Sequence, residues 1–100
     1  MQPMPSKMTN NLIDELQDAK YKGLIDVSYT PTENNNTSVT VYFADEIKPQ
    51  ARINFARYLN QKYLLFHTKF RYDYDEYTFC FCPLFMTINE YFEERQKQNG

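Results

Sequence analysis

The sequence has 100 residues, a formal charge of −2, and nine Tyr and eight Phe but no Trp. A chain of this length forms one domain with one core, and its two glycines exclude a glycine-rich phosphate-binding loop. No apolar run reaches the length of a transmembrane helix, and residues 1–7 lack the apolar stretch of a signal peptide, so we expect a cytoplasmic protein without membrane contact.

The first predicted element is an amphipathic helix over residues 9–22. Its apolar residues recur at the three-to-four-residue spacing of one buried face, and they are Met8, Leu12, Leu16 and Ala19. Gly23 follows directly, at the position where a left-handed C-cap is expected. The helix should therefore end at Lys22.

Residues 25–30 and 38–43 alternate between apolar and polar side chains, which predicts a β-hairpin around a polar loop. If Tyr29 pairs with Val39, every strong hydrophobe of both strands lies on one face. The other apolar pairs in this register are Val27–Val41 and Ile25–Phe43.

A second helix is predicted to begin after Asp45, which can act as its N-cap. Pro49 is tolerated in the first turn of a helix. The expected core-facing residues of this helix are Ala51, Phe55, Tyr58 and Leu59. Arg57 then lies nearly opposite this apolar face.

The second hairpin spans residues 63–82, with its turn in residues 73–76. A register that pairs Tyr72 with Tyr77 again collects the large hydrophobes on one face. The further pairs are Phe70–Phe79 and Thr68–Phe81 on that face, and Arg71–Thr78, Lys69–Cys80 and His67–Cys82 on the other.

The segment Thr87-Ile88-Asn89-Glu90 is a capping box and predicts a last helix. The chain therefore predicts an α+β fold of order α-ββ-α-ββ-α, in which two hairpins form a four-stranded antiparallel sheet with the helices packed on one face. We expect a single domain over residues 8–97, with flexible ends at 1–7 and 98–100.

The residues with reactive character are His67, Cys80 and Cys82. In the predicted register, His67 and Cys82 are neighbours, which would suit a Cys-His nucleophilic pair or part of a metal site. Two soft cysteines and a histidine on a half-covered sheet face explain the same pattern without chemistry. We therefore expect no enzyme, cofactor or metal. A Cys-His or metal enzyme is the third of the three functional hypotheses.

Nucleic-acid binding is the second hypothesis. Residues 47–72 contain no Asp or Glu but six basic residues, and aromatic residues lie between them, a combination that suits backbone attraction and base stacking. The isoelectric point near 5.3 argues against it. The candidate residues, on this segment and the open sheet face, are Arg52, Arg57, Lys62, His67, Lys69 and Arg71.

Binding to another protein is the leading hypothesis. The second hairpin ends in a tip where tyrosines alternate with carboxylates, a composition typical of a binding hot spot and its rim. The open sheet face is expected to be partly apolar, which also favours a partner or a homodimer through that face or an edge strand. The candidate residues are Asp73, Tyr74, Asp75, Glu76, Tyr42 and Tyr63.

The kind of interaction protein is suggested by composition. Small acidic chains rich in Asn and aromatic residues, without a recognisable motif, are common among the products of phages and mobile elements. The sequence hypothesis is therefore an inhibitor of a host enzyme, of the anti-CRISPR or another anti-defence type.

Overall fold

The computed structural model describes residues 7–71 and 73–83. Within these ranges it contains two helices, α1 (Lys7–Tyr21) and α2 (Pro49–Lys62). The strands are β1 (Ile25–Pro31), β2 (Thr37–Phe43), β3 (Phe66–Phe70) and β4 (Glu76–Phe81), with a 3₁₀ turn η1 (Glu33–Asn35) between β1 and β2. The predicted α+β class is confirmed, and the helix predicted at residues 87–90 lies outside the described residues.

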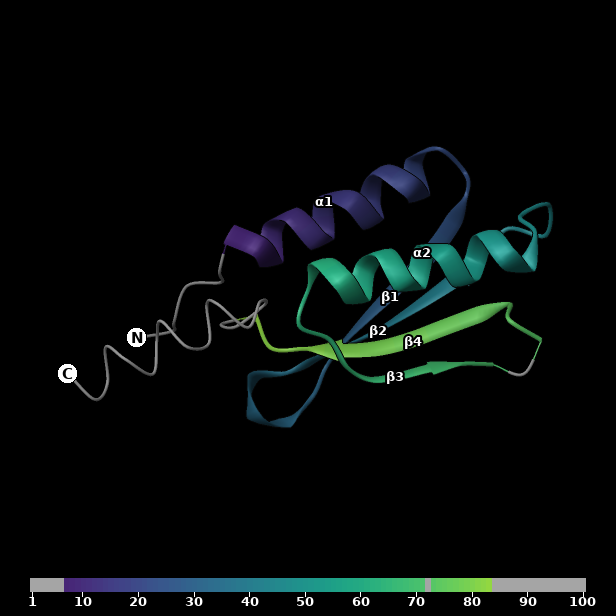
Figure 1. The fold of residues 1–100 in the computed structure, drawn as a ribbon. Helices are drawn as coiled ribbons and strands as arrows, with labels where there is room; N and C mark the ends of the chain where they lie inside the picture. The colour runs from purple at the N-terminus through teal and green to yellow at the C-terminus, as the bar shows by residue number, and fades with distance from the viewer. Residues whose placement is uncertain (1–6, 72, 84–100) are drawn as a thin grey trace.

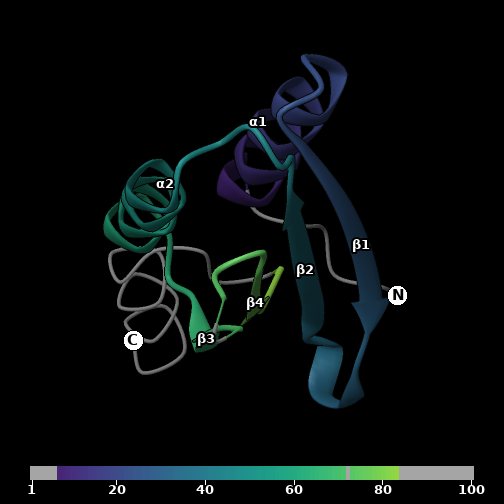
Figure 2. The same ribbon diagram turned by 90° about the vertical axis from the view of Figure 1, so that its right-hand side faces the viewer.

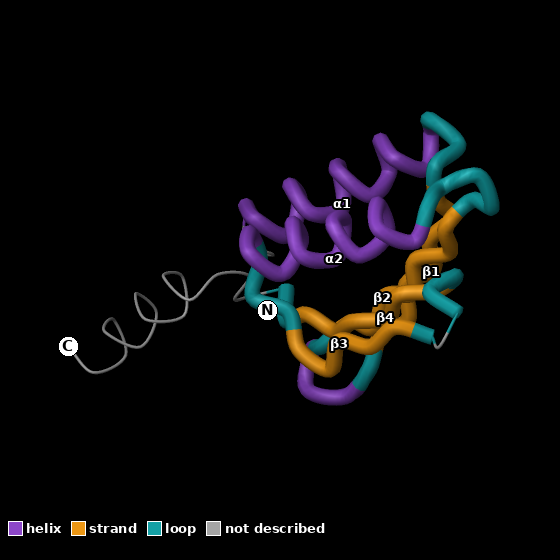
Figure 3. Tube along the Cα trace, turned by 45° about the vertical axis from the view of Figure 1, so that its right-hand side comes forward, coloured by secondary structure: helices purple, strands orange, loops and turns teal. Residues whose placement is uncertain are grey.

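The four strands form one antiparallel sheet in the order β1-β2-β4-β3. The two hairpins therefore meet through β2 and β4 at the centre, and β1 and β3 form the edges. Both helices lie side by side on one face of the sheet (Figures 1 and 3). Figure 2 shows α1 toward β1 and β2, and α2 toward β3.

The register of the first hairpin is as predicted. Tyr29 pairs with Val39, and Ile25 pairs with Phe43. Because side chains alternate along a strand, this register sends Val27, Val39 and Val41 into the core beneath the helices. The helix-facing side of β1 and β2 is consequently almost fully apolar.

The register predicted for the second hairpin is wrong by two residues. Phe70 pairs with Tyr77, and Lys69 pairs with Thr78. The cause lies at the turn, where the Arg71 amide donates to the Glu76 carbonyl at 3.0 Å and the Arg71 side chain contacts the Glu76 carboxylate. A shift of two residues keeps each side chain on its predicted face, so Phe70 still points toward the helices.

The predicted neighbours His67 and Cys82 are also wrong. The pairing of β3 with β4 is irregular between Phe66 and Lys69, and Phe66 is the residue opposite Cys80. His67 lies inside this irregularity with a positive φ of 53°. An extra residue in one strand turns the following side chains to the other face, which a regular hairpin pattern does not predict.

The two helices bury their predicted faces to different degrees. In α1, Leu12 and Leu16 are fully buried, and Gly23 forms the C-cap with φ 77°. In α2 the buried residues are Arg52, Ala56 and Leu59. Of the residues predicted to face the core, Leu59 is buried and Phe55 packs against the core, whereas Ala51 and Tyr58 are exposed. The helix is therefore rotated from the prediction and turns an arginine inward.

Among the described strands, the two at the margins of the sheet carry features that interrupt strand pairing. In β1 the backbone of alternate residues faces outward, and there the Val27 amide donates to the Asp26 side chain at 2.9 Å. Pro31, at the end of the same strand, has no amide hydrogen. The irregularity around His67 disturbs the edge formed by β3.

Candidate functional site

Three connections between elements meet at one end of the molecule, which is the right-hand end in Figure 1. They are the α1–β1 turn (22–24), the β2–α2 loop (44–48) and the described residues of the β3–β4 tip (71 and 73–76), and we call them the three-loop end. Backbone hydrogen bonds join them, because the Ala44 amide donates to the Leu24 carbonyl at 3.0 Å and the Phe43 amide to the Asp75 carbonyl at 3.0 Å.

The Arg52 side chain, which comes from α2, connects two of these loops. Its side chain is 8% exposed and lies over the ring of Phe43. The guanidinium donates to backbone carbonyls of two of the loops, namely those of Ala44, Asp45, Ile47 and Tyr74. An arginine fork whose donors are satisfied by backbone carbonyls in a part-buried position is a structural clamp. Arg52 is therefore not positioned for the nucleic-acid contact that the sequence suggested.

The backbone of the tip is held in an unusual conformation. Tyr74 has a φ of 60°, a left-handed region that tyrosine rarely adopts. Its amide donates to the Arg71 carbonyl at 2.9 Å, while its own carbonyl accepts from Arg52. The ring leans on Phe70 with centroids 5.3 Å apart and remains 39% exposed.

The tip also carries three carboxylates next to Tyr74 in sequence. Asp75 and Glu76 lie 3.8 and 3.1 Å from the Arg71 guanidinium. A hydrogen bond between the carboxyls of Asp73 and Asp75 raises the pKa of Asp75 and lowers the pKa of Asp73. The four predicted tip residues thus lie together, and at neutral pH the tip has more negative than positive charge.

An apolar pocket of about 280 Å³ opens in the same part of the molecule, between the end of α1 and the start of α2. Its lining residues are Ala19, Leu24, Ile25, Phe43, Ile47, Ala51 and Phe55. The sequence analysis missed this pocket. Its signal was the presence of Leu24 and Ile47 in connections, where large apolar residues are unusual.

A second polar cluster joins the two helices at the other end of α2. Glu15 of α1 accepts hydrogen bonds from the hydroxyls of Tyr58 and Tyr63 and, at 3.1 Å, from Lys62. Tyr63 is only 3% exposed, so the expectation that it forms part of a partner-binding surface is wrong. Its ring fills the core beyond α2, and its hydroxyl is satisfied by Glu15.

The open face of the sheet is more polar than expected. One row across the strands is Ser28, Thr40, Thr78 and Lys69. Tyr42 is 40% exposed on this face, and Cys80 and Cys82 are half-buried free thiols. Among the described residues, no group of three or more His, Cys, Asp or Glu is arranged to hold a metal ion.

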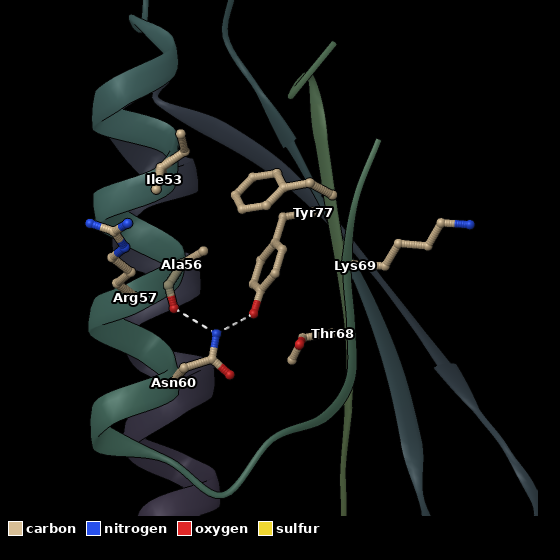
Figure 4. A pocket seen from close by; sticks show the side chains of 8 residues that line it. Ile53, Ala56, Arg57, Asn60, Thr68, Lys69 and Tyr77 are labelled. Carbon is tan, nitrogen blue, oxygen red and sulfur yellow. Dashed lines mark hydrogen bonds between the residues drawn. The ribbon is translucent and has the colours of Figure 1, made fainter. Parts of the chain in front are cut away.

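A shallow groove of about 220 Å³ runs between α2 and β3 (Figure 4). Inside it, the Asn60 amide donates to the Ala56 carbonyl at 2.9 Å and to the Tyr77 hydroxyl. The groove is bordered by Arg57 and Lys69, but Figure 4 shows their side chains pointing in opposite directions. Two cations that diverge do not form a site for one anion.

The six candidate nucleic-acid residues are therefore dispersed. Arg52 is buried, Lys62 is paired with Glu15, and Arg71 is paired with Glu76. His67 is exposed in the irregular part of β3, and Arg57 and Lys69 diverge. Three of the six candidate cations are thus buried or paired with a carboxylate.

No helix in the described ranges is long and apolar enough to cross a membrane. Comparison with known proteins gives no further guide: no family model matches the chain, and no curated protein or solved structure matches it either.

Proposed function

We propose that this protein is a small non-catalytic module that binds a protein partner through the three-loop end. The observation that carries the proposal is the Arg52 clamp, which fixes the backbone beneath Tyr74 while the Tyr74 ring stays 39% exposed. An ordered surface binds more tightly because it loses less conformational entropy on association.

The chemistry of the tip supports the same proposal. An exposed tyrosine contributes a large contact area with few rotatable bonds, and tyrosine is enriched among the residues that dominate binding energy. Asp73, Asp75 and Glu76, next to it in sequence, supply a charged rim. A rim of one charge steers an oppositely charged partner toward the site.

The finer hypothesis from the sequence is a phage or mobile-element inhibitor of a host enzyme. As a proposal it predicts a stoichiometric complex with one host protein, such as a nuclease or polymerase. The complex should form with wild-type protein in size-exclusion chromatography and should be lost in the double variant Tyr74→Ala with Asp75→Ala.

The open sheet face offers a matched control. Asp26 and Tyr42 are adjacent residues on that face, so Asp26→Ala with Tyr42→Ala removes one carboxylate and one exposed tyrosine, as the tip variant does. Binding that survives the control but not the tip variant supports the proposal. Loss of binding only in the control would move the site to the open face and overturn it.

Oligonucleotide binding tests the competing hypothesis. Fluorescence anisotropy with single- and double-stranded oligonucleotides at roughly 50 and 200 mM salt separates electrostatic binding from none. We expect no binding, because the cations are dispersed. Salt-sensitive binding that Lys69→Glu with Arg71→Glu abolishes would favour a nucleic-acid-binding domain instead.

A further inference from the structure

We infer that the partner surface is a basic segment with one large apolar side chain, which enters the apolar pocket beside the tip. This inference rests on the proposed function, and it names the chemistry of the partner. Two features of the three-loop end carry it: the lining of the pocket and the charge of the loops.

The pocket is suited to an apolar anchor. Its seven lining residues are apolar, and they come from α1, β1, β2, α2 and the connections between them. Apolar cavities of about 150 Å³ already accept a benzene ring, so about 280 Å³ is enough for a side chain such as Leu, Met or Phe. A polar side chain there would lose its water without gaining a hydrogen-bond partner.

The loop that contributes Ile47 to the pocket also carries carboxylates. The loop 44–48 contributes Asp45 and Glu46, both exposed, directly before the lining residue Ile47. The tip contributes a further group of carboxylates, namely Asp73, Asp75 and Glu76.

The cations of the three-loop end offset this charge only in part. Lys22 is paired with Asp18 at 3.0 Å, and Arg71 is paired with Glu76 at 3.1 Å. Arg52 adds a buried positive charge beneath two of the loops, where its partners are backbone carbonyls. Lys48 follows Asp45 and Glu46 in the loop 44–48. The carboxylates of this end still outnumber its cations. Charge complementarity therefore favours Lys or Arg on both sides of the anchor.

The pocket and the acidic tip are connected through the backbone. The Ala44–Leu24 and Phe43–Asp75 backbone bonds tie the pocket rim to the tip, so one short segment can reach both. The apolar side chain supplies most of the binding energy by burial, and the flanking cations supply orientation and speed of association.

The test uses three fluorescein-labelled nine-residue peptides and fluorescence anisotropy. The first has a central Leu flanked by two Lys on each side, the second replaces Leu by Ser, and the third replaces each Lys by Glu. We expect the first to bind and the other two to bind roughly tenfold or more weakly, as expected when the apolar contact or the charge match is lost. Equal binding of the Leu and Ser peptides, or of the Lys and Glu peptides, overturns the inference.

Protein variants locate the binding site. Ala51 is exposed at the pocket wall in the first turn of α2, so Ala51→Trp fills the pocket without entering the core. Gln61→Trp places the same side chain at an exposed position near the end of the same helix. Binding of the Leu peptide should fall roughly tenfold or more in Ala51→Trp and stay unchanged in Gln61→Trp. Equal effects of the two variants overturn the inference.

The inference and the proposed function can fail separately. If the natural complex is lost in Tyr74→Ala with Asp75→Ala but survives Ala51→Trp, the function stands and the inference fails. If the complex survives both, both fail. Sedimentation velocity tests whether a second copy of this chain occupies the pocket instead. If the wild type dimerises and Ala51→Trp abolishes the dimer, the second copy is the occupant and the inference is overturned.

Discussion

The hydroxyl of Tyr63 donates a hydrogen bond to the carboxylate of Glu15, which joins the residue after α2 to the middle of α1. Tyr58 and Lys62 donate to the same carboxylate from the last turns of α2. The Tyr63 ring is buried, so its hydroxyl would lose its water without a partner. The pair thereby fixes how the two helices lie on the sheet.

Breaking this pair should destabilise the domain. We expect Glu15→Gln and Tyr63→Phe each to lower the free energy of unfolding by about 1–2 kcal/mol, since the first removes the charge of the acceptor and the second removes the donor. In a double-mutant cycle measured by urea unfolding, the two losses should not add fully, because both changes act on the same bond. Fully additive losses would show that the two side chains do not interact.

Glu15 should also make stability depend on pH. Burial raises the pKa of Glu15, but the hydrogen bonds from Tyr58, Tyr63 and Lys62 outweigh it and lower the pKa below its ordinary value of 4.5. A carboxylate whose folded pKa is depressed stabilises the fold above the unfolded pKa, and that contribution is lost as the pH falls through the folded pKa.

Urea unfolding of wild type and Glu15→Gln between neutral and acidic pH measures this contribution. We expect the difference in unfolding free energy to be largest near neutral pH and to shrink below the ordinary pKa of 4.5. Asp75 has a raised pKa and acts in the opposite direction, so both proteins should carry Asp75→Asn. A difference that grows on acidification would contradict the assignment.

Arg52 should be needed for stability as well as for the shape of the tip. Arg52→Met leaves carbonyl oxygens of two loops, in a part-buried position, without their donor, and we expect a loss of roughly 1–3 kcal/mol. Hydrogen exchange of the Tyr74 amide, which donates to the Arg71 carbonyl, should become faster. Arg57→Met on the exposed side of α2 is the control and should change stability by about 0.5 kcal/mol or less.

The face assignment of β3 predicts opposite results for two adjacent residues. The Phe70 ring packs on Tyr77, with centroids 4.7 Å apart, so Phe70→Asp should cost about 3–5 kcal/mol or unfold the domain. The Lys69 side chain is exposed and points away from α2, so Lys69→Asp should be nearly neutral. Circular dichroism during heating measures both, and equal effects would contradict the face assignment.

The regular parts of the fold could be predicted because their patterns are local. The alternation in β1 and β2 predicts that Ile25, Val27 and Val41 lie on one buried face, and the structure has this face and the predicted register. The register of β3 with β4 failed because it depends on Arg71 closing the turn with Glu76. Shifts of two residues keep the same face buried, so hydrophobic pattern cannot distinguish them.

The candidate site was predictable only in part. The exposed ring of Tyr74 and its neighbouring carboxylates follow from the composition of a turn. The role of Arg52 does not, because it depends on carbonyl oxygens contributed by residues as distant as Tyr74. For the same reason Tyr63 looked like a surface aromatic, since its partner Glu15 lies in another helix.

The two interrupted sheet edges have a consequence for how the protein behaves in a crowded solution. A chain with 17% aromatic residues and strands rich in Val, Tyr and Phe is the kind that stacks into fibrils when a strand edge is open. Asp26, Pro31 and the bent stretch at His67 oppose such growth at both margins. We therefore expect concentrated solutions to stay free of amyloid, as measured by thioflavin fluorescence. The double variant Pro31→Val with Asp26→Val should form amyloid more readily than the wild type.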